Sequence, residues 1–167
     1  MTLFSQEHYQ TKPAGRVNVW HRKKARRTAL QAIYQYFMTH EDLHAVEAQF
    51  RADSHVKRID LNYFHFMLYG VVEKQEQLDK LLAPHITRDA DMLDHIERII
   101  LYIAALEFMQ REVPPKVIVN EAVDLAKHFA ADDSYKYINA VLNKLIFGKT
   151  FTAAVSDNSD KKTDNKS

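Results

Sequence analysis

The sequence predicts an all-α domain, and three observations support this fold class. The chain of 167 residues has only three glycines and four prolines, too few for the many tight turns of an all-β protein. Residue types that favour long helices, such as alanine, leucine, glutamate and lysine, are plentiful. Apolar residues recur at spacings of three and four along most of the chain. With 46% apolar residues, the chain is long enough for one domain with a hydrophobic core.

Three helices are predicted in the first half of the chain. The apolar stripe of the first, over residues 25–37, consists of Ala25, Ala29, Ala32, Ile33, Tyr36 and Phe37. A short second helix is indicated over residues 43–50, where apolar residues again follow helical spacing. A longer third helix is predicted over residues 61–82, and Pro84 should end it because proline cannot continue a helix.

Three more helices are predicted in the second half. Asp94 and Glu97 have the spacing of a capping box, and the helix after them is apolar on almost every side, so we expect it at the centre of the domain. Residues 113–115, Val-Pro-Pro, should end that helix and start the next, since proline is tolerated in a first turn. Residues 132–134 offer an N-cap for the last helix, which Gly148 is expected to end.

The termini differ in composition from the helical body. Residues 1–21 are predicted to be a flexible basic extension, residues 22–148 the folded domain, and residues 149–167 a disordered polar tail. The absence of cysteine excludes disulfides and Cys-based zinc sites. No signal-peptide pattern and no apolar run near the ~18 residues of a membrane span are present, so a cytoplasmic protein without a membrane partner is expected.

Charge is sorted along the chain. No Asp or Glu occurs between His8 and His40, yet this segment holds seven cations, and because the whole chain is only +1 the remainder is acidic. The seven cations are Lys12, Arg16, Arg22, Lys23, Lys24, Arg26 and Arg27. Cations at the start of a helix are unfavourable for stability because they oppose the helix dipole. The same position favours binding of a polyanion, because the cations and the unpaired backbone N–H groups of the first turn can both contact its phosphates. A solvated basic arm is the alternative.

Four segments resemble, in order and spacing, the NusB family of transcription antitermination factors. They are RKKARRTALQAIY at residues 22–34, ILYIAALEF at 100–108, VPPKVIVNEAVDLAK at 113–127 and DSYKYINAVLNK at 133–144. The resemblance implies an all-α domain of six to seven helices in two packed helical-bundle subdomains, with no enzymatic activity and no cofactor. It also implies binding of single-stranded boxA RNA from ribosomal RNA operons together with the ribosomal protein NusE, and through them an indirect action on RNA polymerase. Tyr102 departs from an arginine that is frequent in the family's central helix.

Two stretches combine cations with flat side chains, as single-stranded RNA requires. The first is a collar of five cations round the start of the first helix: Arg22, Lys23, Lys24, Arg26 and Arg27. The second opens the last helix, where Asp133, Lys136 and Tyr137 match RNA-facing positions by resemblance. Tyr137 could instead belong to the apolar stripe of that helix, and Asp133 could simply be its N-cap. Replacing Arg22, Lys24 and Arg26 is expected to weaken RNA binding without unfolding the domain.

The resemblance also implies a surface for the protein partner. Tyr34, Asp91 and Glu97 match partner-contact positions of the family, and an acidic patch would suit a basic ribosomal protein. Each has an alternative role, since Glu97 fits the capping box with Asp94 and Tyr34 could lie at the edge of the core.

Other functions are less well supported by the sequence. His40, Glu41 and His44 give one Glu-x-x-His and a pair of histidines four apart, but a di-iron bundle needs two such motifs and more carboxylates. No phosphate-binding glycine loop or nucleophile motif is present, which argues against an enzyme. A generic helical DNA-binding protein and the RNA-docking arm of an RNA cytosine methyltransferase remain alternatives, although residues 149–167 leave little room for a cofactor-binding α/β fold.

Overall fold

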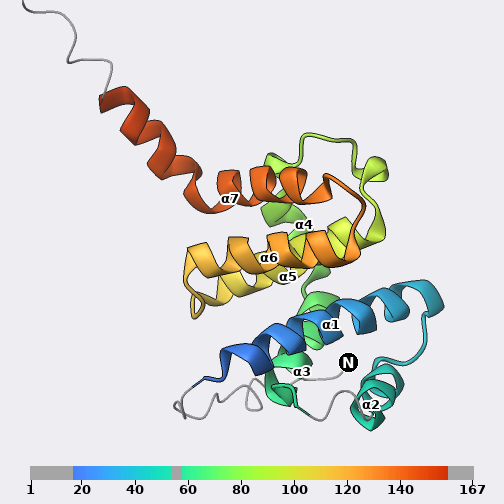
Figure 1. Ribbon diagram of the computed structural model, residues 1–167. Coiled ribbons are helices and arrows are strands. Elements are labelled where there is room, and N and C mark those ends of the chain that lie inside the picture. Colours follow the sequence, from blue (N-terminus) through green and yellow to red (C-terminus); the bar gives the residue numbers. More distant parts are fainter. Residues whose placement is uncertain (1–16, 54–57, 158–167) are drawn as a thin grey trace, which may run out of the picture.

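The computed structural model describes residues 17–53 and 58–157, and within them the secondary structure is entirely helical, which confirms the predicted all-α class (Figure 1). The α-helices are α1 (Val19–Thr39), α2 (Leu43–Ala52), α3 (Leu61–Glu73), α4 (Gln75–Leu82), α5 (His95–Gln110), α6 (Pro115–Phe129) and α7 (Ser134–Asp157). Two short 3-10 turns, η3 (Ala83–His85) and η4 (Ala90–Met92), connect α4 to α5. As predicted, α6 begins at Pro115.

Helix α5 lies at the centre of the domain, as its all-round apolar character predicted. Every residue from Ile99 to Glu107 is buried, because α1, α3, α4, α6 and α7 all pack against this helix. Asp94 caps its start by accepting a hydrogen bond of 2.7 Å from the backbone N–H of Glu97. The close approach of α3 to α5 depends on Gly70, since a Cβ at this position would lie 2.7 Å from a methyl carbon of Leu106 on α5. The core is therefore organised around one helix.

The helices form two packed groups, as the resemblance implied. One group contains α1, α2 and α3, and the other contains α4 to α7. In Figure 1, α5 and α6 lie between α1 on one side and α7 on the other. The first turns of α1 and of α7 are therefore held apart by the middle layer.

The predicted helix over residues 61–82 is wrong as a single element, because the structure breaks it at Lys74. This residue has φ −103° and ψ 16°, which ends α3, and α4 starts at the next residue. The two pieces have different neighbours: α3 packs mainly on α1, whereas α4 packs on α5. Tyr102, buried in α5, anchors α4 by donating a 2.5 Å hydrogen bond to Asp79. Tyr102 therefore has a structural use here, because it holds α4 against α5.

Helix α7 does not end at Gly148, contrary to the prediction. It continues to Asp157, and Figure 1 shows this last part extending away from the other helices. Among the described glycines none has positive φ, so Gly148 does not adopt the left-handed conformation of a helix stop. Residues 149–157 of the predicted disordered tail are thus helical. Residues 1–16 of the predicted extension and residues 158–167 of the predicted tail lie outside the described residues.

Candidate nucleic-acid interface

The basic segment lies inside α1 rather than at its start. Asn18 caps the helix, since its side-chain oxygen accepts hydrogen bonds from the backbone N–H groups of Trp20 (3.1 Å) and His21 (3.2 Å). The helix therefore begins at Val19, well before the predicted Ala25. Because successive helical residues are ~100° apart, the five cations divide between a face that contacts other helices and a face that does not.

Arg26 lies in the core and is not part of a surface collar. Its side chain is only 4% exposed, and its Nε and Nη2 atoms both lie 2.8 Å from Oε1 of Glu107, which is 1% exposed. Glu121 lies 3.8 Å away on the other side of the guanidinium. Removing Arg26 would leave Glu107 as a buried charge without its cation. The expectation that Arg26 can be replaced without harm to the fold is therefore wrong.

Tyr63 completes this buried cluster. Its hydroxyl donates a hydrogen bond to Glu107, and its ring lies 5.5 Å from the guanidinium carbon of Arg26. Burial, followed by the nearby Glu107 carboxylate, raises the pKa of Tyr63 above its ordinary value. For Arg26, burial alone would lower the pKa, but the interactions with Glu107 outweigh it and raise the pKa. At neutral pH the cluster holds a charged guanidinium and a neutral phenol.

Arg22 and Lys23 also face neighbouring helices. Lys23 Nζ lies 2.8 Å from Asp124 and 3.8 Å from Glu121, both on α6. The guanidinium of Arg22 lies 4.3 Å from the ring centre of Tyr63 on α3. With Arg26, these side chains tie α1 to α3, α5 and α6. Three of the five predicted RNA-binding cations thus have intramolecular partners.

Lys24 and Arg27 are the two cations on the outer face. Lys24 is exposed and Arg27 half-buried, and neither forms an ion pair with any residue in the two described ranges. Trp20, four residues before Lys24, is 71% exposed, and Tyr34, seven residues after Arg27, is 40% exposed. Positions 20, 24, 27 and 34 share one side of a helix. This side, which we call the outer face of α1, carries two cations between two aromatic rings.

The second predicted stretch, at the start of α7, is exposed but internally paired. Asp133 has a left-handed backbone (φ 68°), and its carboxylate lies 3.1 Å from Lys136 Nζ. Both side chains are largely exposed, at 75% and 66% respectively. An exposed pair of this kind contributes little to stability, so it can be opened by a competing ligand at small cost.

Tyr137 is half-buried and one face of its ring is covered. The guanidinium carbon of Arg88 lies 4.0 Å from the ring centre, and the backbone N–H of Arg88 donates a 3.4 Å hydrogen bond to the hydroxyl. The ring also packs against the core. The packing supports the interpretation of Tyr137 as part of the apolar stripe, while stacking on an RNA base stays a prediction.

Glu97 is not on the surface, which corrects its expected contact with a protein partner. It is 4% exposed, and its Oε1 accepts a 2.8 Å hydrogen bond from the hydroxyl of Ser134 and lies 3.4 Å from Arg88 Nη1. Its carboxylate thereby joins α5 to the start of α7 and to Arg88. Glu97 can influence an interface only through these neighbours.

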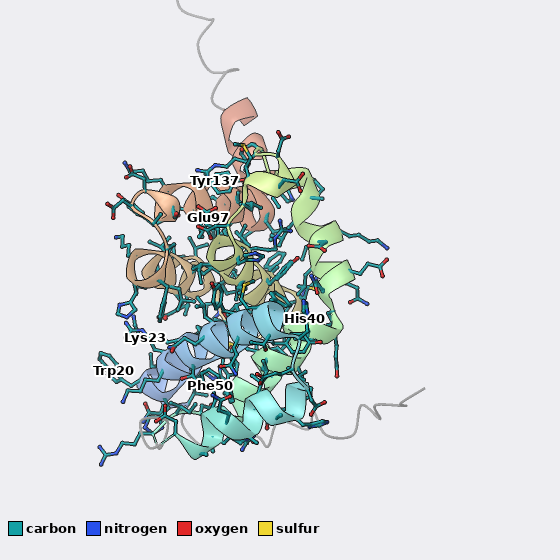
Figure 2. All side chains as sticks on the ribbon, turned by 90° about the vertical axis from the view of Figure 1, so that its right-hand side faces the viewer. Trp20, Lys23, His40, Phe50, Glu97 and Tyr137 are labelled. Atoms are coloured by element: carbon teal, nitrogen blue, oxygen red, sulfur yellow. The ribbon has the colours of Figure 1, made fainter. Side chains whose placement is uncertain are left out.

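Tyr34 and Asp91 are accessible, unlike Glu97. Tyr34 lies on the outer face of α1, and Asp91 is exposed in η4 beside Met92, which is 73% exposed. In Figure 2, Trp20 and Lys23 lie on α1, well below Tyr137 and Glu97. The middle layer of α5 and α6 separates the two basic stretches, so they do not form one continuous site.

Sequence reasoning missed Trp20 and Arg88. Trp20 fell in the predicted flexible extension because the apolar stripe starts only at Ala25. The available signal was Asn18, a good N-cap residue directly before Val19 and Trp20. Arg88 lies in a connection without periodicity, and its role depends on Tyr137, 49 residues later.

The histidine motif near α2 does not assemble a metal site. Across the described parts of the chain no group of three His, Cys, Asp or Glu side chains is placed to hold a metal ion. His44 instead lies with its Nδ1 2.7 Å from the hydroxyl of Tyr69 on α3. In the same ranges no helix is both long enough and apolar enough to span a bilayer.

A family model and individual relatives of known name both match this chain, and they agree on the family. The NusB family model matches residues 23–147. The transcription antitermination protein NusB of Aeromonas salmonicida is 47% identical over 126 residues, which cover 75% of this chain and 92% of the relative. The protein of the same name from Acinetobacter baumannii is 44% identical over 125 residues, 74% of this chain and 84% of the relative.

Solved structures show the same fold. A chain in a crystal structure of antitermination factors NusB and NusE in complex with dsRNA has a TM-score of 0.68 and 24% identity, covering 78% of this chain and 99% of that one. NusB of T. maritima has a TM-score of 0.64 and 20% identity, covering 78% and 96%. At such identities the likeness concerns the arrangement of the helices.

Proposed function

The chain belongs to the NusB family, and from this premise we propose that it is an RNA-binding transcription antitermination factor. Its ligand would be boxA-type single-stranded RNA of ribosomal RNA operons, bound together with the ribosomal protein NusE. The names of the relatives and the solved complex of NusB and NusE with dsRNA support the general function. The outer face of α1, where Lys24 and Arg27 form no ion pair with any described residue, is the observation that carries RNA binding.

The chemistry of RNA binding would begin with phosphates. Lys24 and Arg27 are three residues apart and lie on one side of α1, so one strand can reach both. Because no carboxylate among residues 17–53 and 58–157 pairs with either charge, binding a phosphate would break no ion pair in that part of the chain. Arg22, Lys23 and Arg26 would act indirectly, by fixing α1 through their contacts with α3, α5 and α6.

The start of α7 would supply a second contact. Lys136 can turn from Asp133 to a phosphate, and the exposed part of the half-buried Tyr137 ring would contact a base. Arg88 would hold that ring in place through its 4.0 Å contact. Because α5 and α6 separate this site from α1, the RNA would have to pass round the domain or use one stretch at a time.

The protein partner would contact Tyr34 and Asp91. Tyr34 shares the outer face with the RNA-binding cations, so a partner bound there could add its own RNA contacts beside them. Asp91 would attract a basic protein. Glu97 would act from beneath the surface by holding Arg88 and Ser134. The mechanism is that of a binding module without catalysis, which raises the local occupancy of an RNA element near the polymerase.

The test is a titration of short labelled RNAs, with and without the ribosomal partner, at several salt concentrations. Parent protein should bind a boxA-like single strand, and the partner should strengthen binding. Replacing both Lys24 and Arg27 by Ala should lower the salt-dependence slope by about 1.4, because each phosphate contact on a single strand contributes about 0.7. The control is Lys80→Ala, which removes one exposed cation from α4. The Nζ atom of Lys80 lies 3.1 Å from Oε1 of Glu76.

Competition separates this function from the alternatives. Equal affinity for boxA-like RNA, duplex RNA and duplex DNA would indicate a generic nucleic-acid-binding protein. An unchanged salt slope in the double variant would remove the outer face of α1 from the proposal. Tyr137→Ala should cost about 1–3 kcal/mol of RNA binding if a base stacks there, while Tyr137→Phe keeps the ring and most of the affinity.

A further inference from the structure

Trp20 is a large aromatic side chain exposed at the first turn of α1. Its residue exposure is 71%, and it is the single tryptophan of the chain. It precedes residues 23–147, the part that matches the family, so nothing in the family match assigns it a role. Burial in the described fold does not explain it either.

The structure holds Trp20 at a defined place on the helix. The Asn18 cap accepts a hydrogen bond from the Trp20 backbone N–H at 3.1 Å, which fixes the first turn. At ~100° per residue, Lys24 lies about 40° from Trp20 round the helix and Arg27 about 20° on the other side. The ring therefore belongs to the same narrow strip as the two unneutralised cations.

The charge of this strip indicates the chemistry of what binds it. No Asp or Glu occurs between His8 and His40, so the outer face of α1 carries cations and aromatics without a carboxylate. A flat ring beside unpaired cations is the combination that holds single-stranded nucleic acid, with phosphates on the cations and an unstacked base on the ring. The first two turns of α1, with Trp20 and Lys24, therefore offer no carboxylate of their own to a basic protein.

We propose that Trp20 is a stacking platform for an unpaired base of the RNA whose phosphates bind Lys24 and Arg27. The proposal rests on the proposed function and extends its RNA-binding surface one helical turn beyond the family match. Stacking on an indole is tolerant of base identity, so Trp20 would lengthen the bound segment without choosing its sequence.

The single tryptophan makes the test direct, because its fluorescence reports on Trp20 alone. Titrating the full chain with a boxA-like single-stranded RNA should quench this fluorescence along the binding curve measured independently by labelled RNA. Trp20→Ala should weaken binding about 5- to 100-fold, whereas Trp20→Phe, which keeps a ring, should lose much less. The matched control is Val19→Ala, since Val19 is 69% exposed and adjacent but points about 100° away.

Extending the RNA by two nucleotides at either end locates the contact. Parent protein should gain affinity from one of the two extensions, and Trp20→Ala should not. Equal affinity of Trp20→Ala and parent, with fluorescence unchanged by bound RNA, would overturn the role of Trp20 while salt-dependent RNA binding kept the proposed function intact. Quenching that appears only when the protein partner is added would also overturn it, in favour of a protein contact. Absence of any RNA binding by the parent would refute the proposed function itself, and the platform with it.

Discussion

The inner face of α1, which contacts α3, α5 and α6, and its outer face both carry cations. The two faces place these cations in opposite environments. On the inner face Arg26 is 4% exposed and shares Glu107 with Tyr63, and Lys23 reaches Asp124 on α6. On the outer face Lys24 and Arg27 have no carboxylate partner among the described residues. A rotation of ~100° between neighbouring positions thus decides whether a cation holds the fold together or stays available to a ligand.

This comparison shows why a count of positive charges overstates a binding surface. A cluster of five cations suggests five phosphate contacts, whereas only two of the five lack an ion-pair partner within the part of the chain that the structure describes. Under the proposed function, Arg22, Lys23 and Arg26 would act by fixing the helix that carries Lys24 and Arg27. The two faces should therefore respond to substitution in opposite ways, one in stability and the other in RNA binding.

The largest effect is expected for Arg26→Met. Loss of the guanidinium leaves Glu107 buried and without its cation, which should lower the free energy of unfolding by about 3–5 kcal/mol. Urea denaturation followed by circular dichroism measures this. The double variant Arg26→Met with Glu107→Gln should recover a large part of the loss, because the buried charge is gone and Tyr63 keeps an acceptor. A fully stable Arg26→Met protein would mean that the cluster is not structural.

Tyr63→Phe should cause the next largest loss in the free energy of unfolding. The size of this loss should depend on pH. Removing a hydroxyl bonded to a carboxylate should cost about 1.5–3 kcal/mol at pH 8. In the folded protein the pKa of Tyr63 is raised, whereas in the unfolded chain it is ~10. Above pH 10 the unfolded chain therefore releases this proton first, and stability from Tyr63 falls by up to about 1.4 kcal/mol per pH unit.

The measurement is the free energy of unfolding of both proteins between pH 8 and 11. The difference between parent and Tyr63→Phe should be constant below pH 10 and should narrow above it. A constant difference across the whole range would show that Tyr63 ionises equally in the folded and unfolded states.

Much of the fold could be predicted from the sequence because apolar spacing reports which side chains are buried. This signal gave the central position of α5, and local chemistry gave the Asp94 cap and the start of α6 at Pro115. The break between α3 and α4 at Lys74 was not predicted, because the apolar pattern continues through it. The chain changes direction there only because α3 and α4 pack against different helices.

The candidate site was harder to predict because buried charges look like surface charges in a sequence. Glu107, the partner of Arg26, is 81 residues away, and Glu97 is held by Ser134, 37 residues away, and by Arg88, nine residues away, so neither arrangement has a local signature. One clue was present: Arg26 precedes Ala29, Leu30 and Ile33 by three, four and seven residues, which places it on the apolar stripe. Lys24 and Arg27 lie off that stripe, in agreement with their outward position.

Lys23→Ala tests the edge of the inner face and should lower the free energy of unfolding less than Arg26→Met or Tyr63→Phe does. Its ion pair with Asp124 is partly exposed, with side-chain exposures of 24% and 49%, so its loss should cost about 0.2–1 kcal/mol. RNA affinity should change little at moderate salt. A loss of RNA binding as large as that of Lys24→Ala would place Lys23 on the ligand side and break the division between the faces.

Lys24→Ala should have the smallest effect on the fold and the clearest effect on RNA. The side chain is exposed and forms no ion pair within the described ranges, so the free energy of unfolding should stay within about 0.5 kcal/mol of the parent. The salt-dependence slope of RNA binding should fall by about 0.7, the contribution of one phosphate on a single strand. Because Lys23 and Lys24 are adjacent and chemically identical, the pair of variants separates position from charge. If the two variants behaved alike in both assays, the orientation of α1 would not be what distinguishes its cations.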